Sequence, residues 1–561
     1  MERLPLRRHI RRLSLLTIAV ILITILPNLY HPAEAASSFR PLDDSQAEFS
    51  QGNFQRTAIS AGKSSAFNDK DGVLQLAAVG ALNPWTISTP LPMPLGSPGI
   101  ATIGNRLYTV AGATTGQGTG QAFTNAVYWA SANQQTGAFK SHDLTTPPPG
   151  ADISDLIWVN DPLPSATAFM SPSPDANCTT EVIQGRRAPA VATLVTGSGT
   201  DYIYAIGGAF KPSSLCTLNT MTSPIVQIGA VNTTSGDINW SDSQANYLPS
   251  PNVPGADTTG IATLTGKDAR GVEGATAAIV HTASGPIYLY VIGGLASNFF
   301  PDGIFQGFAT PAVFYTRLNP TTGALQHPTD ATSLTPWART TNVPVSIPYG
   351  GPGDFGLFNH TAIVSRATVG SGTGTTFREA IYVTGGYTEY KATSNKTANS
   401  AVFRATIADE ATGALTWTTA LNPPSTNAVA MDIQRGDTAG FAYGSKLYVI
   451  GGRDKNTSAP LSSISTGIHD DNLNMLPLFS GLNSEYFIGG VGAVVLANPV
   501  YGLGAAVIPA MPLSSSTTAQ NAAWGYAIGG YDSNGAPTAQ IYRGSIGGED
   551  ETTATQRAPE G

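Results

Sequence analysis

Charged and tyrosine side chains follow a pair of glycines at several points of this sequence. Tyr387, Arg453 and Tyr531 come directly after such pairs. Side chains of these types can hydrogen-bond and stack on a ligand, and loops on a rigid scaffold usually carry recognition. The plain alternative is that they are solvated loop residues or turn caps. The predicted contact residues are Arg187, Phe299, Phe300, Asp302, Asp354, Tyr387, Tyr390, Arg435, Asp437, Arg453, Asp454, Tyr531 and Asp532.

Signatures of catalysis are missing from the sequence. It contains no Gly-x-Ser-x-Gly elbow, no His-Glu-x-x-His pair and no Walker loop. Asp69-Lys-Asp71-Gly72 hints at a calcium loop but lacks enough acidic ligands at alternating positions. We therefore expect no catalytic residue, no metal site and no cofactor. The histidines beyond the amino-terminal segment are scattered, at His142, His281, His327, His360 and His469.

Composition favours an all-β protein. Only 12% of the 561 residues are charged, whereas Gly (61) and Pro (40) are abundant, so the chain is rich in turns and poor in helix surfaces. A hydrophobic content of 41% argues against wholesale disorder. The net charge is −8 and no basic patch follows the first dozen residues, so nucleic acid is not expected as a partner.

The amino terminus has the features of an export signal. Five arginines within residues 1–12 precede an apolar run from 13 to about 26, and Ala33-Glu34-Ala35 offers a small-x-small cleavage site. The alternative is an uncleaved anchor, which would confine membrane contact to this segment. We expect a secreted or cell-surface protein. Its predicted parts are a signal peptide at 1–35, a polar linker at 36–79, a folded region at 80–546 and a disordered tail at 547–561.

One pattern recurs six times between these ends. It is an aromatic-rich strand that ends in a Gly pair, as at 202–208, 288–294 and 447–452. Tyr, Val and Ile favour strands, and paired glycines allow positive φ angles and close backbone approach. The pairs end at positions 112, 208, 294, 386, 452 and 530, with Ala111 replacing one Gly in the first copy.

Three further signals frame each copy. A segment of small residues precedes it and suits an innermost strand crowded around an axis. A strand with a Thr-Gly or Ser-Gly hairpin turn follows in four copies, and in five places a Trp leads to a Pro. The turns contain Gly137, Gly236, Gly323 and Gly413. The tryptophans are Trp85, Trp158, Trp240, Trp337 and Trp417.

The Tyr-Val-Ile-Gly-Gly strand with a downstream Trp resembles the kelch motif over residues 80–546. This resemblance implies an all-β, kelch-type propeller of four-stranded antiparallel blades. The Gly pairs lie 66 to 96 residues apart, whereas kelch units typically have about 50 residues. The surplus must lie in loops, nearly all of which we expect on one face, where they would form the binding surface.

The strand around Trp85 resembles an outer strand yet precedes the first inner strand. We expect it to complete the last blade and close the ring, which removes exposed edges. Residues 483–499 hold another Ile-Gly-Gly, so a seventh, degenerate blade is an alternative. The six predicted blades are 98–163, 186–249, 271–344, 357–424, 427–482, and 500–546 with 80–90.

The two cysteines, Cys178 and Cys216, fall in connections that emerge on the same face of a four-stranded meander. Export to an oxidising compartment would then pair them. We predict a disulfide between them, with two unpaired thiols as the alternative.

We expect the chain to be a binding or scaffolding module for a protein or a glycan. Two alternatives remain. One is a propeller enzyme with a site at the channel mouth, either carbohydrate-active or similar to the copper-radical oxidases that resemble galactose oxidase. That copper chemistry needs two His, two Tyr and a Cys bonded to one Tyr around one metal. The other alternative is a structural cell-surface protein.

The export signal makes a prediction about the mature chain. Because signal peptidase cuts after a small-x-small site, the exported protein should begin at Ala36. Intact mass spectrometry and amino-terminal sequencing of the exported chain measure this directly. A mature protein that still begins at Met1 would contradict the prediction and favour the uncleaved anchor.

Overall fold

The computed structural model describes residues 85–117, 121–140, 157–169, 180–211, 220–249, 271–299, 305–345, 356–369, 376–389, 397–418, 431–455, 457–476, 487–489, 495–510 and 521–547. All of these lie in the compact unit Ala66–Gly561. The predicted signal peptide, linker, disulfide and, apart from Gly547, tail lie outside the described residues. Within the described residues no helix has the length and apolar character needed to cross a bilayer.

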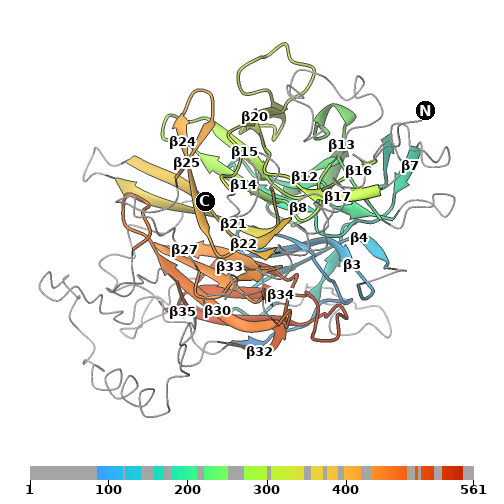
Figure 1. Ribbon diagram of the computed structural model, residues 1–561, viewed down its shortest axis with the longest axis vertical. Helices are drawn as coiled ribbons and strands as arrows, with labels where there is room; N and C mark the ends of the chain where they lie inside the picture. Colours follow the sequence, from blue (N-terminus) through green and yellow to red (C-terminus); the bar gives the residue numbers. More distant parts are fainter. Residues whose placement is uncertain are drawn as a thin grey trace, which may run out of the picture. The chain divides into compact units, whose positions relative to one another are not determined.

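Six of the ten antiparallel sheets in the described chain have a main path of four strands, and these six are the blades (Figure 1). The other four are two-stranded: β6 (Ala166–Phe169) with β7 (Thr180–Ile183), β10 (Ala209–Phe210) with β11 (Met221–Thr222), β16 (Leu295–Phe299) with β17 (Phe305–Ala309), and β26 (Arg435–Gly436) with β29 (Arg453–Asp454). Every strand of a blade pairs with the next strand outwards. From the inside outwards, blade 1 has β2 (Gly99–Ile103), β3 (Arg106–Ala113), β4 (Phe123–Ser131) and β5 (Val159–Asn160). Blade 2 has β8 (Ala190–Leu194), β9 (Thr200–Ile206), β12 (Val226–Asn232) and β13 (Ile238–Asp242). Blade 3 has β14 (Thr276–His281), β15 (Ile287–Ile292), β18 (Val313–Leu318) and β19 (Leu325–Gln326), and β20 (Ala338–Thr340) also pairs with β18.

Blades 4 to 6 follow the same plan. Blade 4 has β21 (Gly356–Val369), β22 (Thr376–Glu389), β24 (Val402–Asp409) and β25 (Ala414–Thr418), and β23 (Thr397–Ala398) also pairs with β22. Blade 5 has β27 (Ala439–Tyr443), β28 (Lys446–Ile450), β30 (Leu461–Ile468) and β31 (Phe487–Gly489), and β32 (Val495–Val500) also pairs with β30. Blade 6 has β33 (Gly504–Pro509), β34 (Asn521–Ile528), β35 (Ile541–Gly547) and β1 (Thr86–Ile87).

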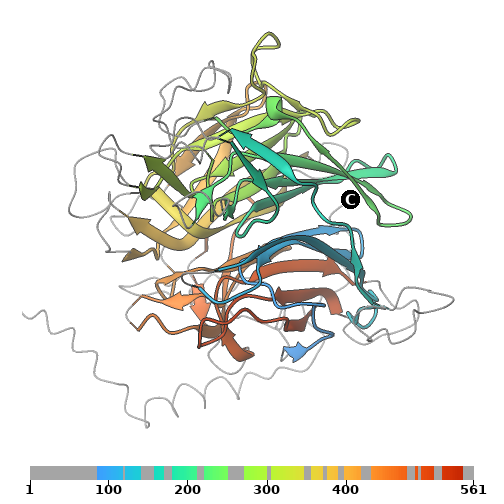
Figure 2. The ribbon, with the colours of Figure 1, turned by 90° about the vertical axis from the view of Figure 1, so that its right-hand side faces the viewer.

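The six inner strands form a closed ring. Each inner strand contacts the next, in the order β2, β8, β14, β21, β27 and β33, and β33 contacts β2 again. Figure 2 shows blue blade 1 against red blade 6, although they come from opposite ends of the described chain. The predicted six-bladed, all-β propeller of four-stranded blades is confirmed.

The ring closes as the sequence predicts. Strand β1 pairs with β35, with Thr86 opposite Arg543 and Ile87 opposite Tyr542, and the Ser88 amide donates to the Ile541 carbonyl at 2.8 Å. Trp85 is buried in the core between blades 5 and 6. The outer edge of the last blade is therefore supplied by the first described residues.

The alternative of a seventh blade is wrong. The second Ile-Gly-Gly segment lies in β31, which pairs with β30 of blade 5, and β32 pairs with the same strand. Both segments extend blade 5 rather than starting a new sheet, because the long β30 offers pairing sites along its outer edge.

The Gly pairs join neighbouring blades. Both glycines adopt positive φ, as in Gly207 (63°) and Gly208 (93°), and Ala111 takes the same conformation in blade 1 (59°). The second glycine donates its amide hydrogen to the segment that leads into the next blade. These bonds run from Gly112 to the Arg186 carbonyl (2.8 Å), Gly208 to Val272 (2.7 Å), Gly294 to Leu357 (2.7 Å), Gly452 to Val500 (3.0 Å) and Gly530 to Leu95 (2.8 Å).

A tyrosine on the second strand makes a further bond between blades. Its hydroxyl donates to a backbone carbonyl in the turn between the third and fourth segments of the next blade. These bonds run from Tyr108 to Gly236 (3.3 Å), Tyr204 to Gly323 (2.8 Å), Tyr290 to Gly413 (2.7 Å), Tyr382 to Leu473 (2.5 Å) and Tyr526 to Gly137 (2.7 Å).

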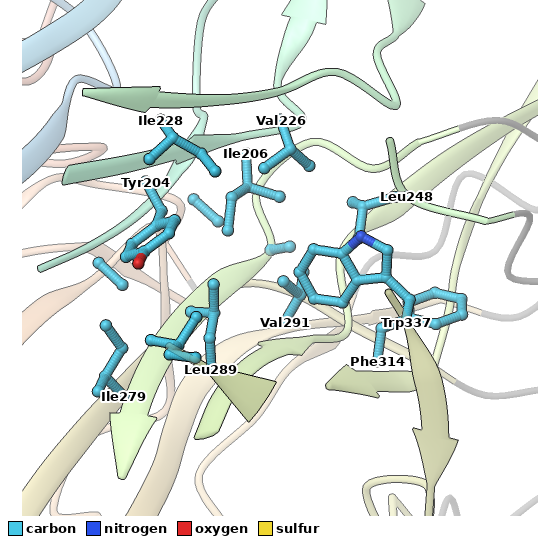
Figure 3. Close-up of a cluster of buried hydrophobic side chains, with 14 of the residues drawn as sticks. Tyr204, Ile206, Val226, Ile228, Leu248, Ile279, Leu289, Val291, Phe314 and Trp337 are labelled. Atoms are coloured by element: carbon cyan, nitrogen blue, oxygen red, sulfur yellow. The ribbon is translucent and has the colours of Figure 1, made fainter. Parts of the chain in front are cut away.

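The outer-strand tryptophans bind in the opposite direction around the ring. Four of the five indoles donate to the segment that follows the outer strand of the previous blade, from Trp158 to Pro90 (2.9 Å), Trp240 to Asp161 (3.1 Å), Trp337 to Asn246 (2.8 Å) and Trp417 to Thr341 (2.9 Å). The buried Nε1 of Trp85 has no such partner among the described residues. Figure 3 shows Trp337 of blade 3 beside Phe314 and Leu248, within the apolar core shared by blades 2 and 3.

The turn glycines generate a stability prediction. Gly413 has φ +72°, and a Cβ there would lie 2.5 Å from the Tyr288 ring of blade 3, whereas Gly197 has φ +67° with open space around it. Both Gly413→Ala and Gly197→Ala should cost about 1–2 kcal/mol of left-handed strain. Gly413→Ala should cost about 1–3 kcal/mol more, because the new methyl group displaces Tyr288.

Chemical denaturation of the two variants measures the difference. Gly197→Ala is the matched control for backbone strain alone. Equal losses of unfolding free energy in both variants would contradict the proposed packing of the turn against the neighbouring blade.

Candidate functional site

One residue per blade adopts a left-handed conformation where the chain starts its inner strand. We call these six residues the mouth ring: Ser97 (φ 48°), Ala188 (47°), Gly274 (60°), Asn359 (51°), Asp437 (55°) and Gly502 (56°). A non-glycine residue at positive φ is uncommon, and Asn and Asp tolerate it best. The repeat of this conformation in every blade shows that the fold imposes it.

Backbone hydrogen bonds link the mouth ring around the channel. Each links an amide of one blade to the carbonyl of the previous blade's ring residue. They run from Ala188 to Ser97 (2.9 Å), Gly274 to Ala188 (3.2 Å), Asn359 to Gly274 (2.7 Å), Gly502 to Asp437 (2.9 Å) and Ser97 to Gly502 (2.8 Å). These bonds fix the width of the channel at its mouth.

Each blade presents two further positions beside the ring. The residue before the ring residue lies opposite the residue that follows the Gly pair. These opposed pairs are Gly96 with Ala113, Arg187 with Ala209, Glu273 with Leu295, Phe358 with Tyr387, Gly436 with Arg453, and Tyr501 with Tyr531. Blades 4 to 6 therefore contribute the aromatic and charged residues after the Gly pair, whereas blades 1 to 3 contribute apolar ones there.

These positions surround a cavity of about 310 Å³ above the mouth ring, which we call the mouth cavity. It shares Ser97, Ala188, Asn359 and Asp437 with the ring. The structure brings six predicted contact residues together here. They are Arg187, Tyr387, Asp437, Arg453, Asp454 and Tyr531.

Asp437 is the centre of one hydrogen-bonded group. Its carboxylate accepts from the Asn359 amide at 2.6 Å and from the Tyr387 hydroxyl at 3.0 Å, and Arg453 Nε lies 3.8 Å away. The carboxylate is almost fully buried. Burial raises the pKa of Tyr387, and the charge and hydrogen bond of Asp437 raise it further, so the phenol stays protonated.

Arg187 organises a second group. It pairs with Glu273 at 3.2 Å and donates to Gln121, which in turn donates to the Tyr531 hydroxyl at 3.1 Å. Burial alone would lower the pKa of Arg187, but the charge and hydrogen bond of Glu273 outweigh it and raise that pKa. Both arginines of the mouth cavity are thus held close to an acidic partner.

Tyrosine rings join the two groups. Tyr531 stacks on Tyr501 with 5.2 Å between ring centroids, and the Arg453 guanidinium lies 3.5 Å from the Tyr501 centroid. Arg453 also donates to Gln117 at 3.0 Å. Burial raises the pKa of Tyr531 to about 12, against the opposing effect of Arg187. The cavity wall is a connected set of partners rather than a row of independent loop side chains.

Two other predicted residues serve the fold locally. Arg435 is fully buried in blade 5 and donates to the Gly451 carbonyl (3.2 Å), the Ser463 carbonyl (3.3 Å) and the Ser465 hydroxyl (2.7 Å). Asp532 caps its own turn by accepting from the amides of Asn534 (2.8 Å) and Ala536 (2.9 Å). Neither is among the residues that line the mouth cavity.

The remaining predicted contacts cannot be placed at the site. Asp302, Asp354, Phe300 and Tyr390 lie outside the described residues, as do Cys178 and Cys216. Phe299 ends strand β16 (Leu295–Phe299), which forms a hairpin with β17 (Phe305–Ala309).

Sequence reasoning missed Glu273, Asn359, Gln117 and Gln121. When the blades are aligned, Asn359 occupies the mouth-ring position and Glu273 the position before it, so both residues were detectable. The two glutamines lie in the connection after the first Gly pair and carry no comparable signal.

The described histidines do not gather at the mouth. His360 borders the channel with its Nε2 2.8 Å from the Thr276 hydroxyl, and burial lowers its pKa to about 3. His469 lies 2.8 Å from the Asp470 carbonyl and 2.7 Å from the Ser365 hydroxyl, and His281 lies beside Glu379. Among the described residues no group of three or more His, Cys, Asp or Glu side chains could hold a metal ion.

Comparison with known proteins adds little to this geometry. No protein-family model matches the chain, and no curated protein matches it. One solved structure, described as "Structure of YjhT", is similar to it with 13% sequence identity and a TM-score of 0.40, covering 81% of this chain and 95% of that chain.

A rigid ring of blades with a polar cavity at the channel mouth is suited to binding or scaffolding in general. The blades fix the scaffold, and the connections between them are free to vary around it.

The raised pKa of Tyr531 predicts a pH dependence of stability. Its phenol ionises near pH 10 when unfolded and near 12 when folded, so its contribution is complete below pH 10 and is lost as the pH rises towards 12. Between pH 9 and 12, the unfolding free energy of the wild type should therefore fall by about 2–3 kcal/mol relative to that of Tyr531→Phe. Denaturation series at fixed pH measure this shift, and a constant difference would contradict it.

Proposed function

We propose that this chain is an exported, kelch-like propeller that binds the end of a neutral glycan in the mouth cavity. The observation that carries this proposal is that the charges lining the cavity balance, with three cations and three carboxylates, and that both arginines lie close to an acidic partner. Arg187 pairs with Glu273, and Arg453 lies close to Asp437. Asp454 accepts from Thr457 in its own turn, and Lys455 is exposed to solvent.

Charge pairing favours a neutral, hydroxyl-rich ligand. An anion would have to compete with Glu273 and Asp437 for the arginines, and a cation would have to compete with the arginines for these carboxylates. Separating partly buried charges is costly. Sugar hydroxyls both donate and accept, so they can add hydrogen bonds to the remaining sites of the paired groups without separating them.

The size of the cavity supports recognition of a glycan terminus. A volume of about 310 Å³ lies at the lower end of the range for small-molecule sites, roughly 300–1,000 Å³. Tyr387 and Phe358 form a tilted pair in its wall, with 5.6 Å between ring centroids, and offer aromatic surface beside the polar groups. This combination favours one or two sugar units over an extended stretch of polymer.

The remaining parts of the proposal rest on the sequence. The arginine-rich, apolar amino terminus supports export to the cell surface or beyond it, and the polar segment 36–79 would act as a tether. The Gly pairs, second-strand tyrosines and outer tryptophans support the kelch-like assignment, since each contributes to the same contacts in successive blades.

Direct binding measurements test this function. The purified chain should bind neutral saccharides on a glycan array, with affinities then measured by isothermal titration calorimetry. Asp437→Asn keeps a residue that tolerates positive φ but removes the charge beside Arg453, and Arg453→Ala removes the cation. Each should weaken binding at least tenfold, because a buried partner is left unpaired.

Arg317→Ala provides the control, since Arg317 is exposed on β18 away from the mouth cavity. It should bind like the wild type. Three results would overturn the proposal: no binding of any neutral saccharide, tighter binding of charged sugars, or binding that is insensitive to both mouth variants. Selective capture of a protein partner that depends on neither Asp437 nor Arg453 would favour a protein-binding scaffold instead.

A further inference from the structure

We propose that a small cavity beside Arg186, at the contact between blades 1 and 2, is a binding site for a single chloride ion. The ion would balance a positive charge that the fold buries without an acidic partner. This site is separate from the mouth cavity and does not depend on the proposed glycan binding.

Arg186 is a buried cation whose direct partners are all neutral. The residue is 2% exposed. Its guanidinium donates to the Gly207 carbonyl (2.9 Å), the Ile225 carbonyl (3.3 Å) and the side-chain oxygen of Gln227 (2.5 Å). Among the described residues no acidic side chain forms an ion pair with it. Burial lowers the pKa of Arg186 to about 10, although the charge of Asp242 opposes this effect.

Two blades place an arginine two residues before the mouth ring. They are blade 2, with Arg186, and blade 5, with Arg435. The other four blades place a buried aliphatic side chain there, namely Leu95, Val272, Leu357 and Val500. Both arginines donate to the carbonyl of the first glycine of the Gly pair, and both donate to the carbonyl that accepts from that glycine's amide. The two sites are therefore built on the same backbone frame.

Blade 5 compensates its arginine with a carboxylate. Asp432 Oδ1 lies 3.6 Å from Arg435 Nη2, and the same oxygen accepts from the Ser465 hydroxyl at 2.8 Å. Asp432 stands three residues before Arg435. The residue three positions before Arg186 is Ile183, which is buried and uncharged. Blade 2 thus buries the same cation without the anion that accompanies it in blade 5.

A cavity lies beside Arg186 at the place that corresponds to this carboxylate. It is bordered by Arg186, Ile183 and Gln227, which align with the three residues of the charged group in blade 5. Its volume of about 10 Å³ is sufficient for one particle of about the size of water, so a polyatomic anion such as sulfate does not fit. The exposed Gln184 also borders it, which gives ions a route from solvent.

Hydrogen-bond donors suited to an anion border the cavity. A guanidinium has five N–H donors, and the three bonds of Arg186 leave two of them without a partner among the described residues. Asn125 donates one N–H of its side-chain amide to the Leu163 carbonyl at 2.8 Å, and the second N–H has no partner within the described residues. A cation would be repelled by Arg186, and a water molecule would leave its charge unbalanced.

Chloride in this cavity would stabilise the folded chain. A buried charge without a counter-charge is costly, and that cost falls when an anion binds next to it. A ligand that binds only the folded state lowers the unfolding equilibrium constant by the factor 1 + [Cl⁻]/Kd. This stabilisation depends on the size of the anion, whereas screening of surface charges depends on ionic strength alone.

Urea unfolding at constant ionic strength tests the inference. Sodium chloride replaces sodium methanesulfonate stepwise, because the methanesulfonate anion is too large for the cavity. The unfolding equilibrium constant of the purified chain should fall about tenfold when chloride reaches about ten times its Kd. Bromide should act in the same way. Equal stability in chloride and methanesulfonate would overturn the inference and leave only water in the cavity.

Two variants show whether the ion lies beside Arg186. Ile183→Asp gives blade 2 the carboxylate that blade 5 has, so it should abolish the chloride dependence while every other arginine stays in place. Arg186→Leu copies the aliphatic blades and should abolish it too. Arg317→Ala, at an exposed arginine of β18, should retain it. A chloride dependence that survives Ile183→Asp places the ion elsewhere and overturns the inference.

Anomalous diffraction from crystals grown in bromide gives a reading that needs no variant, should either substitution prevent folding. A bromide peak is expected between Arg186 and Ile183. Bromide peaks that occur only at other places would refute the site.

Discussion

Hydrogen bonds between the second strand of one blade and the next blade determine how this propeller is assembled. A tyrosine hydroxyl reaches the carbonyl of the neighbouring turn, and the Gly pair at the end of the same strand sends an amide to the neighbouring leading segment. One strand therefore fixes the next blade at both of its ends. The turn carbonyl must lie within reach of the tyrosine hydroxyl of the neighbouring blade. This explains why glycine, which has no side chain to intervene, occupies that position in four of the five turns.

The outer tryptophans complement this arrangement, because they bind the previous blade rather than the next one. Each blade is thus held from both sides by directional bonds around an apolar interface. Dispersion and burial supply most of the stability of such an interface, but they do not specify an angle. The repeated polar contacts do specify the orientation of one blade relative to the next, and the sixth blade meets the first.

The repeats made this fold predictable from the sequence. The Gly pairs and the small inner segments recur six times and the Thr-Gly or Ser-Gly turns four times, each with the same physical demand, and these repetitions located the blades. The strand at Trp85 was found by the same logic, as an outer strand without an inner partner. The segment 483–499 misled because Ile-Gly-Gly occurs there without the aromatic strand before it, and pairing with β30 determined its place.

The candidate site was less predictable, and the reasons are specific. Residues after a Gly pair could be predicted as contact residues only as a class, because the sequence does not show that Arg187 meets Glu273 or that Asp437 meets Tyr387. Arg435 resembles a contact residue in sequence, yet its guanidinium satisfies carbonyls inside its own blade. Ring residues such as Ser97 and Ala188 carry no compositional signal, since the fold rather than the side chain imposes their conformation.

The closure by β1 has a consequence for how the protein reaches its native state. Thr86 and Arg543, which face each other in blade 6, are 457 residues apart in the chain. During synthesis, strand β1 is made long before its partner strand β35. Contacts between such distant segments form slowly. The circle can therefore be sealed only after nearly the whole described chain has been synthesised, which leaves the early blades as an open arc until then.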